Sequence, residues 1–484
     1  MTILYHISLY LYLFAALIAS PFSRKAALFY RGRRGLIKSI RTEIAKLSKE
    51  NDNHAGNMQS TDIADVSDKD RSFERDDINR NNRHGILWIH CASVGEFEQA
   101  RPVIEGYRER NTGDKVIVTF FSPSGYELRK NYPLADKVFY LPMDTIRNAR
   151  RFIEAIEPTT VIFIKYEFWR NYLKILKQKD VPVYLVSGIF RGDQRFFKWW
   201  GGSFRKILTA FRHFFVQDEN SQKLLNNIGF SNVTVSGDTR FDRVYKIVAE
   251  SKEIGIVGDF VADGRIPVVV AGSSWPTDED IISECFSKLP PAKLIIVPHE
   301  IGEKHLERLS DLFGKDKSIR YTEVMSSKVV RRGNGIQSDD TAQSCDMGND
   351  LNHRENGVLK RGAIQDNLLI IDIVGILSSI YKYGSVAYIG GGFGAGIHNI
   401  LEAAVYGVPV VFGPKYHKFK EASDLVVLGG AFSVSNSEEY HAIMERLLSD
   451  ESFRKNCGVI CKKYVEDNLG ATDKILEQIQ TECT

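Results

Sequence analysis

The chain has 484 residues, enough for two domains that each have a hydrophobic core. Its 43% hydrophobic and 26% charged residues are typical of a globular protein, and a net charge of only +3 gives no indication of a nucleic-acid partner. The six cysteines are scattered. Cys457 and Cys461 form at most half of a metal site, so we expect reduced thiols, no metal and no cofactor.

The N-terminus is the apolar exception. Residues 3–19 carry no charged side chain and end shortly before Pro21, and a basic group follows: Arg24, Lys25, Arg31, Arg33, Arg34, Lys38 and Arg41. A secretory signal peptide has its positive charge before the apolar run, whereas charge after the run keeps the rest of the chain in the cytoplasm. We predict that residues 1–22 are a membrane anchor, which either spans the bilayer or lies in its interface. A buried core helix is the alternative.

The next part of the chain changes from polar to regular. Residues 23–84 are predicted to be a basic segment and a polar tether, because residues 51–84 have almost no large apolar side chains. From Gly85, apolar runs alternate with helix-length amphipathic stretches, which predicts an α/β domain with a parallel sheet over residues 85–245. The predicted strands are Ile86–Ile89, Val116–Phe121, Val138–Leu141, Val161–Ile164, Val183–Val186, Phe214–Val216 and Val233–Val235.

A second series of the same kind follows a quieter stretch. Residues 246–261 are predicted to be a linker, and residues 262–484 a second α/β domain with a polar insert near 326–365. Its predicted strands are Val268–Ala271, Leu294–Val297, Val386–Ile389 and Val410–Phe412. Two such domains predict a Rossmann-like pair facing across a cleft, with ligands at the carboxyl ends of the strands.

Glu96 follows the first predicted strand after a turn of small residues. A carboxylate at this edge of the sheet can act as a general base. Ser93 and Glu96 also have the spacing of a helix capping box. Pro102 favours a helix that begins nearer Glu98, which would leave Glu96 in the loop. The catalytic and capping interpretations both remain open.

Two further candidates lie in the first half. Glu167 follows the strand Val161–Ile164 and can bind sugar hydroxyls, pair with Lys165 or start a helix. Arg240 follows the strand Val233–Val235 and can hold a phosphate or carboxylate through two hydrogen bonds, or close the domain with a salt bridge.

In the second half, His299 follows a strand that ends near Pro298 and can contact a phosphate or a base, although a single histidine in a loop usually has no such role. The segment 370–377 can form a wall of the same pocket. Its central residues are Val374, Gly375 and Ile376.

The glycine cluster 390–396 lies between an apolar run and a helix-like stretch that ends at Gly407. Glycine N–H groups and a helix N-terminus suit a phosphate. The pattern also matches a dinucleotide fingerprint, but no acidic residue follows about 20 positions later to bind a ribose. Asn399 and Glu402, three apart in the first turn, are instead typical of a sugar-nucleotide site.

Taken together and in this order, five motifs resemble the 3-deoxy-D-manno-octulosonic acid (Kdo) transferases of lipid A biosynthesis. The resemblance covers the chain from about Gly85 to its end, together with the N-terminal anchor. The motifs are His90-Cys-Ala-Ser-Val-Gly-Glu96, Glu167-Phe-Trp169, Gly237-Asp-Thr-Arg-Phe-Asp242, Val297-Pro-His299 and Gly391 to Pro414 with His398-Asn-Ile-Leu-Glu402.

This resemblance implies the glycosyltransferase B fold and an inverting transfer of Kdo from CMP-Kdo to lipid IVA without a metal, on the cytoplasmic side of the inner membrane. It implies that Glu96 is the general base and that Glu167 and Arg240 stabilise the transition state. The implied CMP-binding residues are Pro298, His299, Val374, Gly375, Ile376, Asn399, Ile400, Leu401 and Glu402. The alternatives are another sugar-nucleotide glycosyltransferase or an epimerase of the same fold, and a non-catalytic nucleotide-binding scaffold at the membrane.

Overall fold

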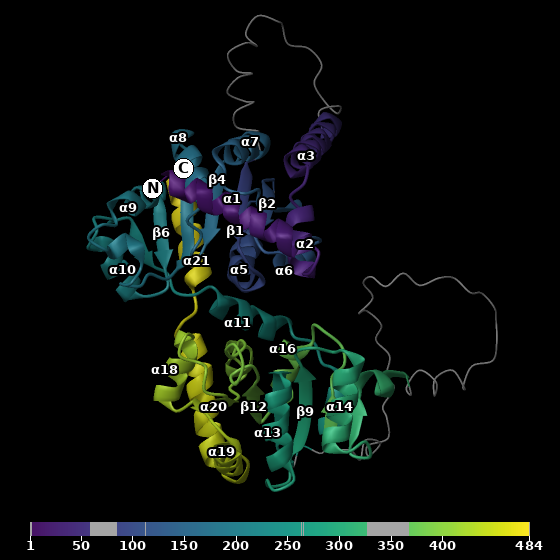
Figure 1. Cartoon of the computed structure of the whole chain (residues 1–484). Coiled ribbons are helices and arrows are strands. Elements are labelled where there is room, and N and C mark those ends of the chain that lie inside the picture. The colour runs from purple at the N-terminus through teal and green to yellow at the C-terminus, as the bar shows by residue number, and fades with distance from the viewer. Residues whose placement is uncertain are drawn as a thin grey trace, which may run out of the picture. The chain divides into compact units, whose positions relative to one another are not determined.

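The computed structural model describes residues 2–58, 85–111, 113–262, 264, 266–326 and 367–483 (Figure 1). The chain divides into two compact units. Unit 1 comprises Met1–Arg243 and Asn468–Thr484, and unit 2 comprises Val244–Asp467. Most of the predicted polar tether, from residue 59 to residue 84, lies outside the described residues, as does the predicted insert from residue 327 onward.

Unit 1 is built on a seven-stranded sheet in the order β3-β2-β1-β4-β5-β6-β7, and every described pairing is parallel. The strands are buried on both faces, which is why they appear in the sequence as continuous apolar runs. All seven predicted strands are confirmed. They are β1 (Ile86–Cys91), β2 (Lys115–Phe120), β3 (Lys137–Tyr140), β4 (Thr160–Ile164), β5 (Val183–Gly188), β6 (His213–Val216) and β7 (Val233–Val235).

Helices cover both faces of this sheet (Figure 1). Side chains of α7 and α8 join one core, and side chains of α5 and α21 join the core on the other face. The helices of unit 1 are α1 (Thr2–Ala19), α2 (Arg24–Arg31), α3 (Leu36–Met58), α5 (Val94–Arg110), α6 (Pro123–Arg129), α7 (Ile146–Ile156), α8 (Arg170–Gln178), α9 (Gly202–Leu208), α10 (Glu219–Asn226), the start of α11 (Arg240–Glu250) and α21 (Ala471–Cys483), with a short 3-10 helix η1 (Arg195–Phe197).

Unit 2 repeats the architecture with the order β10-β11-β9-β8-β12-β13-β14, again parallel throughout the described pairings. Its strands are β8 (Val268–Ser274), β9 (Lys293–Pro298), β10 (Ser318–Arg320), β11 (Leu368–Ile370), β12 (Val386–Ile389), β13 (Val410–Phe412) and β14 (Ala431–Ser433). Its helices are α12 (Gly255–Val261), α13 (Pro276–Phe286), α14 (Glu303–Phe313), α16 (Leu377–Ile380), α17 (Leu401–Ala404), α18 (Lys420–Leu428), α19 (Ser437–Ser449) and α20 (Glu451–Glu466), with the 3-10 helix η2 (Tyr381–Tyr383). The sequence did not predict the three-residue strands β10, β11 and β14, of which β10 and β14 are only partly buried.

The C-terminal helix differs from the prediction that placed it in the second domain. Helix α21 belongs to unit 1, where Ile475, Leu476 and Ile479 are buried beside α5. Asp242 accepts hydrogen bonds from the backbone N–H groups of Gly470 and Thr472, both at 2.7 Å, and so caps the start of α21. The stretch predicted to be a linker, 246–261, contains the end of α11 and all of α12.

The N-terminal residues form α1, which packs on unit 1 through one side. Leu9 is buried with Phe29 and Met143, and Tyr5 donates its hydroxyl to Asp144. Among the residues that the structure describes, no helix is both long enough and apolar enough to cross a membrane. Helix α3 continues to Met58, into the segment predicted to be a tether.

Candidate active site

The predicted site residues of unit 1 lie where its strand order reverses. β1 is flanked by β2 on one side and β4 on the other, and the loops after β1 and β4 carry Glu96 and Glu167. In doubly wound sheets such a point opens a crevice at the carboxyl ends of the strands. The topology therefore brings together two carboxylates that are separated by 71 positions in the sequence.

Glu96 lies in a helix and not in the loop predicted for it. Helix α5 begins at Val94 with Ser93 as its N-cap, and Pro102 lies inside the helix. The Glu96 carboxylate turns back and accepts the backbone N–H of Ala92 at the end of β1. The Ser93 side chain makes no capping hydrogen bond, so the predicted capping box is absent from this helix start. The prediction that the helix begins nearer Glu98 is wrong: α5 starts at the small residues before Glu96 and continues through the proline.

The electrostatic surroundings of Glu96 favour its protonated form. Burial, followed by the negative charge of Glu167, raises the pKa of Glu96 to about 7. Backbone hydrogen bonds and the charge of Lys165 oppose this rise. A carboxylate with a pKa near 7 can accept a proton at neutral pH and still hold it, which are the two properties that a general base needs.

Glu167 is held from two sides. Its side chain is largely buried, with the residue 8% exposed. His90 Nε2 lies 3.1 Å from Glu167 Oε2, and the indole N–H of Trp169 donates to the same oxygen. Lys165, just before it, has a φ of +67°. A non-glycine residue in that region indicates backbone strain, which is most often retained at functional sites.

Arg240 lies on the segment after β7, which packs against α5. Its side chain donates to Asp238 Oδ2 through Nε at 2.9 Å and Nη2 at 2.7 Å, and Thr239 donates to the backbone carbonyl of Gln99 at 2.6 Å. Burial raises the pKa of Asp238, but the charge and hydrogen bonds of Arg240 bring that pKa below its usual range. Because Asp238 and Arg240 form a close ion pair, this guanidinium is oriented before any ligand binds.

In unit 2 the strand order reverses between β8 and β12, and aromatic side chains gather there. The His299 ring stacks on Trp275 with centroids 4.5 Å apart and on His398 with centroids 4.6 Å apart. These three residues follow β9, β8 and β12, so separate strands build the stack. Pro298 ends β9 and is buried, which fixes the start of the loop that carries His299.

Trp275 also fixes the hydrogen bonding of His398. Its Nε1–H donates to His398 Nε2 at 3.2 Å. Burial, and then the charge of His299, lowers the pKa of His398 to about 4. His398 is therefore neutral at pH 7 with its proton on Nδ1, which leaves that N–H as a donor.

Asn399 and Glu402 are brought together as predicted. Asn399 Nδ2 donates to Glu402 Oε1 at 3.1 Å, while its carbonyl oxygen accepts the backbone N–H of Leu401 at 3.2 Å. Ile400 and Leu401 are buried and anchor this turn. The helix that follows is shorter than predicted, because α17 covers only Leu401–Ala404. So short a helix offers little dipole for a phosphate, and that part of the expectation is corrected.

The glycine cluster has a different role from the one predicted for it. A Cβ on Gly390 would lie 2.2 Å from the backbone of Ser273, and one on Gly392 would lie 2.6 Å from the backbone of Gly413. These glycines allow the ends of neighbouring strands to approach each other, so close packing of the backbone already requires residues without a side chain at both positions. Gly391, with a φ of +92°, makes the turn between them.

The predicted wall segment forms the loop after β11. Val374 is 79% exposed, Gly375 has a φ of +95°, and Ile376 begins the turn into α16. The loop lies at the same edge of the sheet as His299 because β11 pairs in parallel with β9. Exposed backbone at this edge is available to a ligand without any side-chain chemistry.

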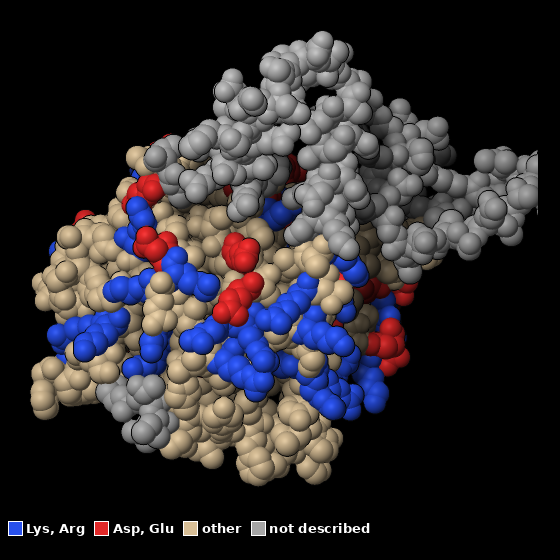
Figure 2. Space-filling view, turned by 90° about the horizontal axis from the view of Figure 1, so that it is seen from above, with Lys and Arg blue, Asp and Glu red and all other residues tan. Residues whose placement is uncertain are grey.

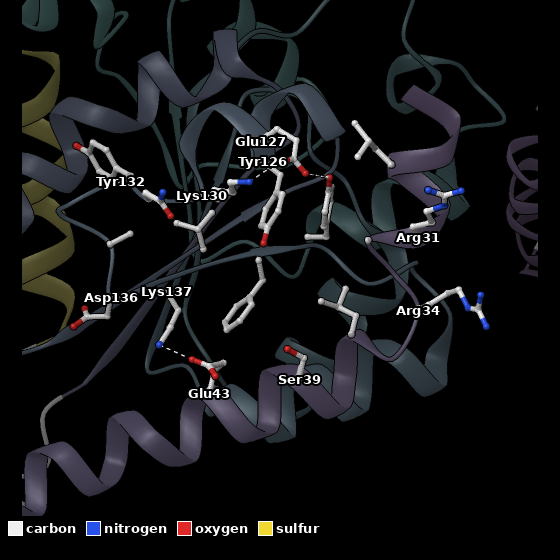
Figure 3. A pocket seen from close by; sticks show the side chains of 18 residues that line it. Arg31, Arg34, Ser39, Glu43, Tyr126, Glu127, Lys130, Tyr132, Asp136 and Lys137 are labelled. Atoms are coloured by element: carbon white, nitrogen blue, oxygen red, sulfur yellow. Dashed lines mark hydrogen bonds and ion pairs between the residues drawn. The ribbon is translucent and has the colours of Figure 1, made fainter. Parts of the chain in front are cut away.

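A separate pocket of about 690 Å³ lies elsewhere in unit 1, between α2, α3, α6 and β3 (Figure 3). Tyr126 and Tyr140 stack in it with centroids 4.1 Å apart, and Lys137 pairs with Glu43 at 2.7 Å. No predicted site residue lines this pocket.

Within the described part of the chain, no group of three or more His, Cys, Asp and Glu side chains is arranged to hold a metal ion.

Sequence reasoning missed four residues that the structure places beside the predicted ones. His90 and Trp169 contact Glu167, and Trp275 and His398 enclose His299. His90, Trp169 and His398 belong to motifs named from the sequence, whereas Trp275 does not, and only the fold shows which of these side chains meet.

Comparison with known proteins shows similarity to one family of transferases. The sequence model described as "3-Deoxy-D-manno-octulosonic-acid transferase (kdotransferase)" matches residues 69–243. A 3-deoxy-D-manno-octulosonic acid transferase of Aquifex aeolicus is 26% identical over 387 residues, which cover 78% of this chain and 90% of that protein. The chain is thus similar in sequence to the Kdo transferase family over most of its length. A transferase of the same description from Rickettsia felis is 26% identical over 409 residues, covering 81% and 78% of the two chains.

Solved structures support the fold of this chain. A UDP-N-acetylglucosamine 2-epimerase from Neisseria meningitidis, bound to UDP-GlcNAc, gives a TM-score of 0.53 at 16% identity, covering 82% of this chain and 99% of that one. A putative epimerase of the same kind from Listeria monocytogenes gives 0.54 at 11% identity, covering 83% and 97%. At these identities the likeness shows the fold alone, which is of the glycosyltransferase B type.

Proposed function

We propose that the protein is an inverting glycosyltransferase that transfers Kdo from CMP-Kdo to lipid IVA, with Glu96 as the general base. The observation that carries this proposal is the carboxylate of Glu96 at the switch point of unit 1, with a pKa of about 7 and Glu167 beside it. Similarity to the Kdo transferase family supplies the donor and the acceptor.

The acceptor half of the reaction follows from the chemistry of a sugar hydroxyl. A neutral hydroxyl is a weak nucleophile, so a base must take its proton while the new bond to the anomeric carbon of Kdo forms. In this proposal, ionised Glu96 accepts that proton and Arg240, oriented by Asp238, faces developing negative charge. The negative charge of Glu167 stabilises the positive charge that develops on the donor sugar.

The donor half is assigned to unit 2. In this proposal, Asn399 and Glu402 bind the cytidine part of CMP, and His299, backed by Trp275 and His398, lies beside the phosphate. The backbone of Val374 to Ile376 completes the site. The departing CMP keeps its phosphate charge, which N–H donors in this stack can stabilise. Transfer requires the base of unit 1 and the donor bound to unit 2 to reach the same acceptor.

The N-terminal helix is proposed to attach the enzyme to the cytoplasmic surface of the inner membrane by lying in the interface. Seven large side chains of α1 are exposed even though its other side packs on unit 1; they are Ile7, Tyr10, Leu11, Tyr12, Phe14, Leu17 and Ile18. Soluble surfaces rarely leave so many apolar groups together. Arg33 does not take part as predicted, since it is largely buried and donates to the backbone carbonyls of Phe29, Leu141 and Phe121.

Unit 1, which carries this apolar helix, also exposes many Lys and Arg side chains. Figure 2, seen from above Figure 1, shows Lys and Arg side chains gathered on one face of the molecule. Helices α7 and α8 and the residue after α8 carry exposed cations: Arg147, Arg150, Arg151, Lys174, Lys177 and Lys179. Each such cation near an anionic lipid surface is worth about 1 kcal/mol.

An apolar pocket of about 740 Å³ adjoins both α1 and the Glu167 loop. Phe168, Phe196 and Phe204 line it, with Tyr5 of α1. We propose it as the place where an acyl chain of the acceptor rests while the sugar reaches Glu96.

The test combines donor and acceptor in one reaction. Purified protein is incubated with CMP-Kdo and lipid IVA, with and without EDTA, and the lipid product is weighed by mass spectrometry. The proposal requires a mass increase of one or more Kdo units with the wild-type protein and a strongly reduced yield of that product with Glu96→Gln in the same reaction time. An epimerase would instead interconvert a nucleotide sugar without any lipid, and a scaffold would bind CMP without turnover.

A further inference from the structure

Two adjacent tryptophans lie at the tip of a tight turn on the surface of unit 1. The backbone carbonyl of Lys198 accepts the N–H of Gly201 at 2.8 Å, so Trp199 and Trp200 occupy the central positions of a four-residue turn, the tryptophan turn (residues 198–201). Trp199 is 92% exposed and Trp200 is 49% exposed. Single exposed apolar residues are normal on a protein surface, but two large adjacent rings indicate a surface that a partner covers.

The tryptophan turn is braced from inside. The guanidinium of Arg205 donates to the backbone carbonyls of Phe196 and Lys198, both at 2.8 Å. A Cβ on Gly201 would lie 2.2 Å from the carbonyl oxygen of Arg195, so only glycine fits there without a change in the backbone. Because the turn is ordered before any contact, a partner can bind the two rings with little loss of conformational entropy.

The tryptophan turn lies beside the apolar pocket that α1 also borders. Trp200 packs edge-to-face on Phe204 with ring centroids 6.1 Å apart. Phe204 lines the pocket of about 740 Å³, and Tyr5 and Ser8 of α1 line it as well. Figure 1 shows the amino end of α1 beside α9, the helix that begins directly after the turn. The pocket therefore connects α1, with its exposed apolar side chains, to the tryptophan turn.

The segment that carries the turn is basic. Between residues 191 and 206, five cations stand against one acid: Arg191, Arg195, Lys198, Arg205 and Lys206 against Asp193. Three of these cations are exposed, namely Arg191, Arg195 and Lys206. Tryptophan is enriched where a bilayer meets water, and cations are attracted to its anionic headgroups. The composition of the segment therefore suits a lipid interface.

We propose that the tryptophan turn is a second contact of unit 1 with the lipid bilayer, separate from α1: Trp199 and Trp200 enter the interfacial layer, and the exposed cations of the segment meet anionic headgroups. The pocket between the two contacts then opens at the bilayer surface, where an acyl chain can enter it without passing through water. This inference rests on the proposed membrane attachment of the enzyme, which α1 alone could also provide.

Vesicle binding tests the second contact. The full-length protein and its Trp199→Ser variant are sedimented with vesicles of phosphatidylethanolamine and phosphatidylglycerol, and the partition coefficient of each is measured. We expect Trp199→Ser to lower the partition coefficient roughly tenfold, because the variant removes most of an indole from the contact. An unchanged partition coefficient overturns the proposal.

Val427 provides a control for the loss of exposed apolar surface. It is 86% exposed on α18 of unit 2. Val427→Ser should leave the partition coefficient unchanged, because this residue takes no part in either proposed contact. If Val427→Ser weakens vesicle binding as much as Trp199→Ser does, binding follows general apolarity, and the specific role of the turn is overturned.

Fluorescence quenching locates the rings. Trp199 is the most exposed of the five tryptophans. Vesicles whose lipids are brominated near the top of the acyl chains should quench wild-type emission, since bromine quenches an indole only at close range. The double variant Trp199→Phe, Trp200→Phe keeps aromatic rings at the tip and should lose most of this quenching while it still binds. Quenching that persists in the double variant overturns the proposal.

A second copy of the chain is the other occupant that the experiments separate. If the protein without lipid sediments as a dimer and Trp199→Ser sediments as a monomer, the turn binds a second copy and the proposal is overturned. Kdo transfer to lipid IVA dispersed in detergent requires no vesicle. Transfer by wild-type protein, with Trp199→Ser partitioning like wild type, therefore refutes the second contact alone. Vesicle binding that depends on Trp199, without any transfer, refutes the proposed transfer reaction alone.

Discussion

The carboxyl edges of the two sheets have the same topology and opposite chemistry. In unit 1 the switch point carries buried carboxylates, and the pKa of Glu96 is raised to about 7. In unit 2 it carries stacked rings and an amide, and the pKa of His398 is lowered to about 4. One edge can exchange a proton near neutral pH through Glu96, whereas at the other edge His398 stays neutral in that range.

Both edges also carry strained backbone. Lys165 in unit 1 and Ser273 in unit 2 have φ values of +67° and +53° just where β4 and β8 reach the site. In the proposed function, two similar scaffolds support different tasks, proton transfer in unit 1 and ligand binding in unit 2, because the residues after their strands differ. The predictions below separate these tasks.

The largest expected effect is on proton transfer. Glu96→Gln keeps the size of the side chain and removes the base, so kcat should fall about 1000-fold. CMP binding, measured by calorimetry, should remain within twofold of wild type, because unit 2 is unchanged. A variant that retains more than a tenth of wild-type turnover would show that another group accepts the proton.

The second prediction concerns binding of CMP by unit 2 and leaves proton transfer by unit 1 unchanged. Asn399→Ala removes the contact with Glu402 Oε1 and the bond to the Leu401 N–H, and we expect CMP affinity to fall roughly 10- to 30-fold. The pH dependence of kcat should keep its wild-type midpoint. A shifted midpoint would mean that the two edges are not chemically separate.

The pH dependence should report the carboxylate pair. With a pKa of about 7, Glu96 is mostly protonated at pH 6, so kcat/KM should fall about tenfold from pH 8 to pH 6. Glu167→Gln removes the neighbouring negative charge, which lowers the pKa of Glu96. The remaining activity of that variant should therefore persist to lower pH, and an unmoved profile would contradict the coupling.

Stability should change in the opposite direction to activity. Because the folded pKa of Glu96 lies above its ordinary value of 4.5, the folded state loses stability as pH rises from about 4.5 to about 7. Glu96→Gln removes this loss, so we expect its free energy of unfolding at pH 8 to exceed that of wild type by about 1–2 kcal/mol. Urea unfolding of both proteins at pH 8 and pH 4 measures this free energy, and we expect little difference between the variant and wild type at pH 4.

The smallest expected effect concerns the ring stack. Trp275→Phe keeps an aromatic face for His299 but removes the N–H that donates to His398. We expect CMP affinity to fall about threefold, consistent with the loss of one neutral hydrogen bond. Trp275→Ala should cost more, and an equal effect of the two would assign the role of Trp275 to its N–H alone.

Much of the fold could be predicted because its signals are local. Strands such as β1 and β4 are buried on both faces, so each is a continuous apolar run with polar residues directly after it. That pattern also placed Glu96, Glu167 and His299 at the ends of strands. The three-residue strands β10, β11 and β14 have no such signal.

The start of α5 and the return of α21 could not be predicted in the same way. Pro102 favours a later helix start when considered alone, yet the helix contains it. Nothing local in Ile475, Leu476 and Ile479 shows that their apolar faces are buried in the core beside α5 and not in unit 2. Both outcomes depend on contacts between residues far apart in the chain.

The sequence by itself determined two α/β halves, the strands that carry the site and the residue types needed for transfer. Only the tertiary structure decided which of those residues meet: Glu96 with Glu167, His299 between two rings, and glycines 390 and 392 against neighbouring strand ends. The reason is physical. Periodicity and turn chemistry act over a few residues, whereas a pKa of about 7 arises from burial and a charge supplied by another strand.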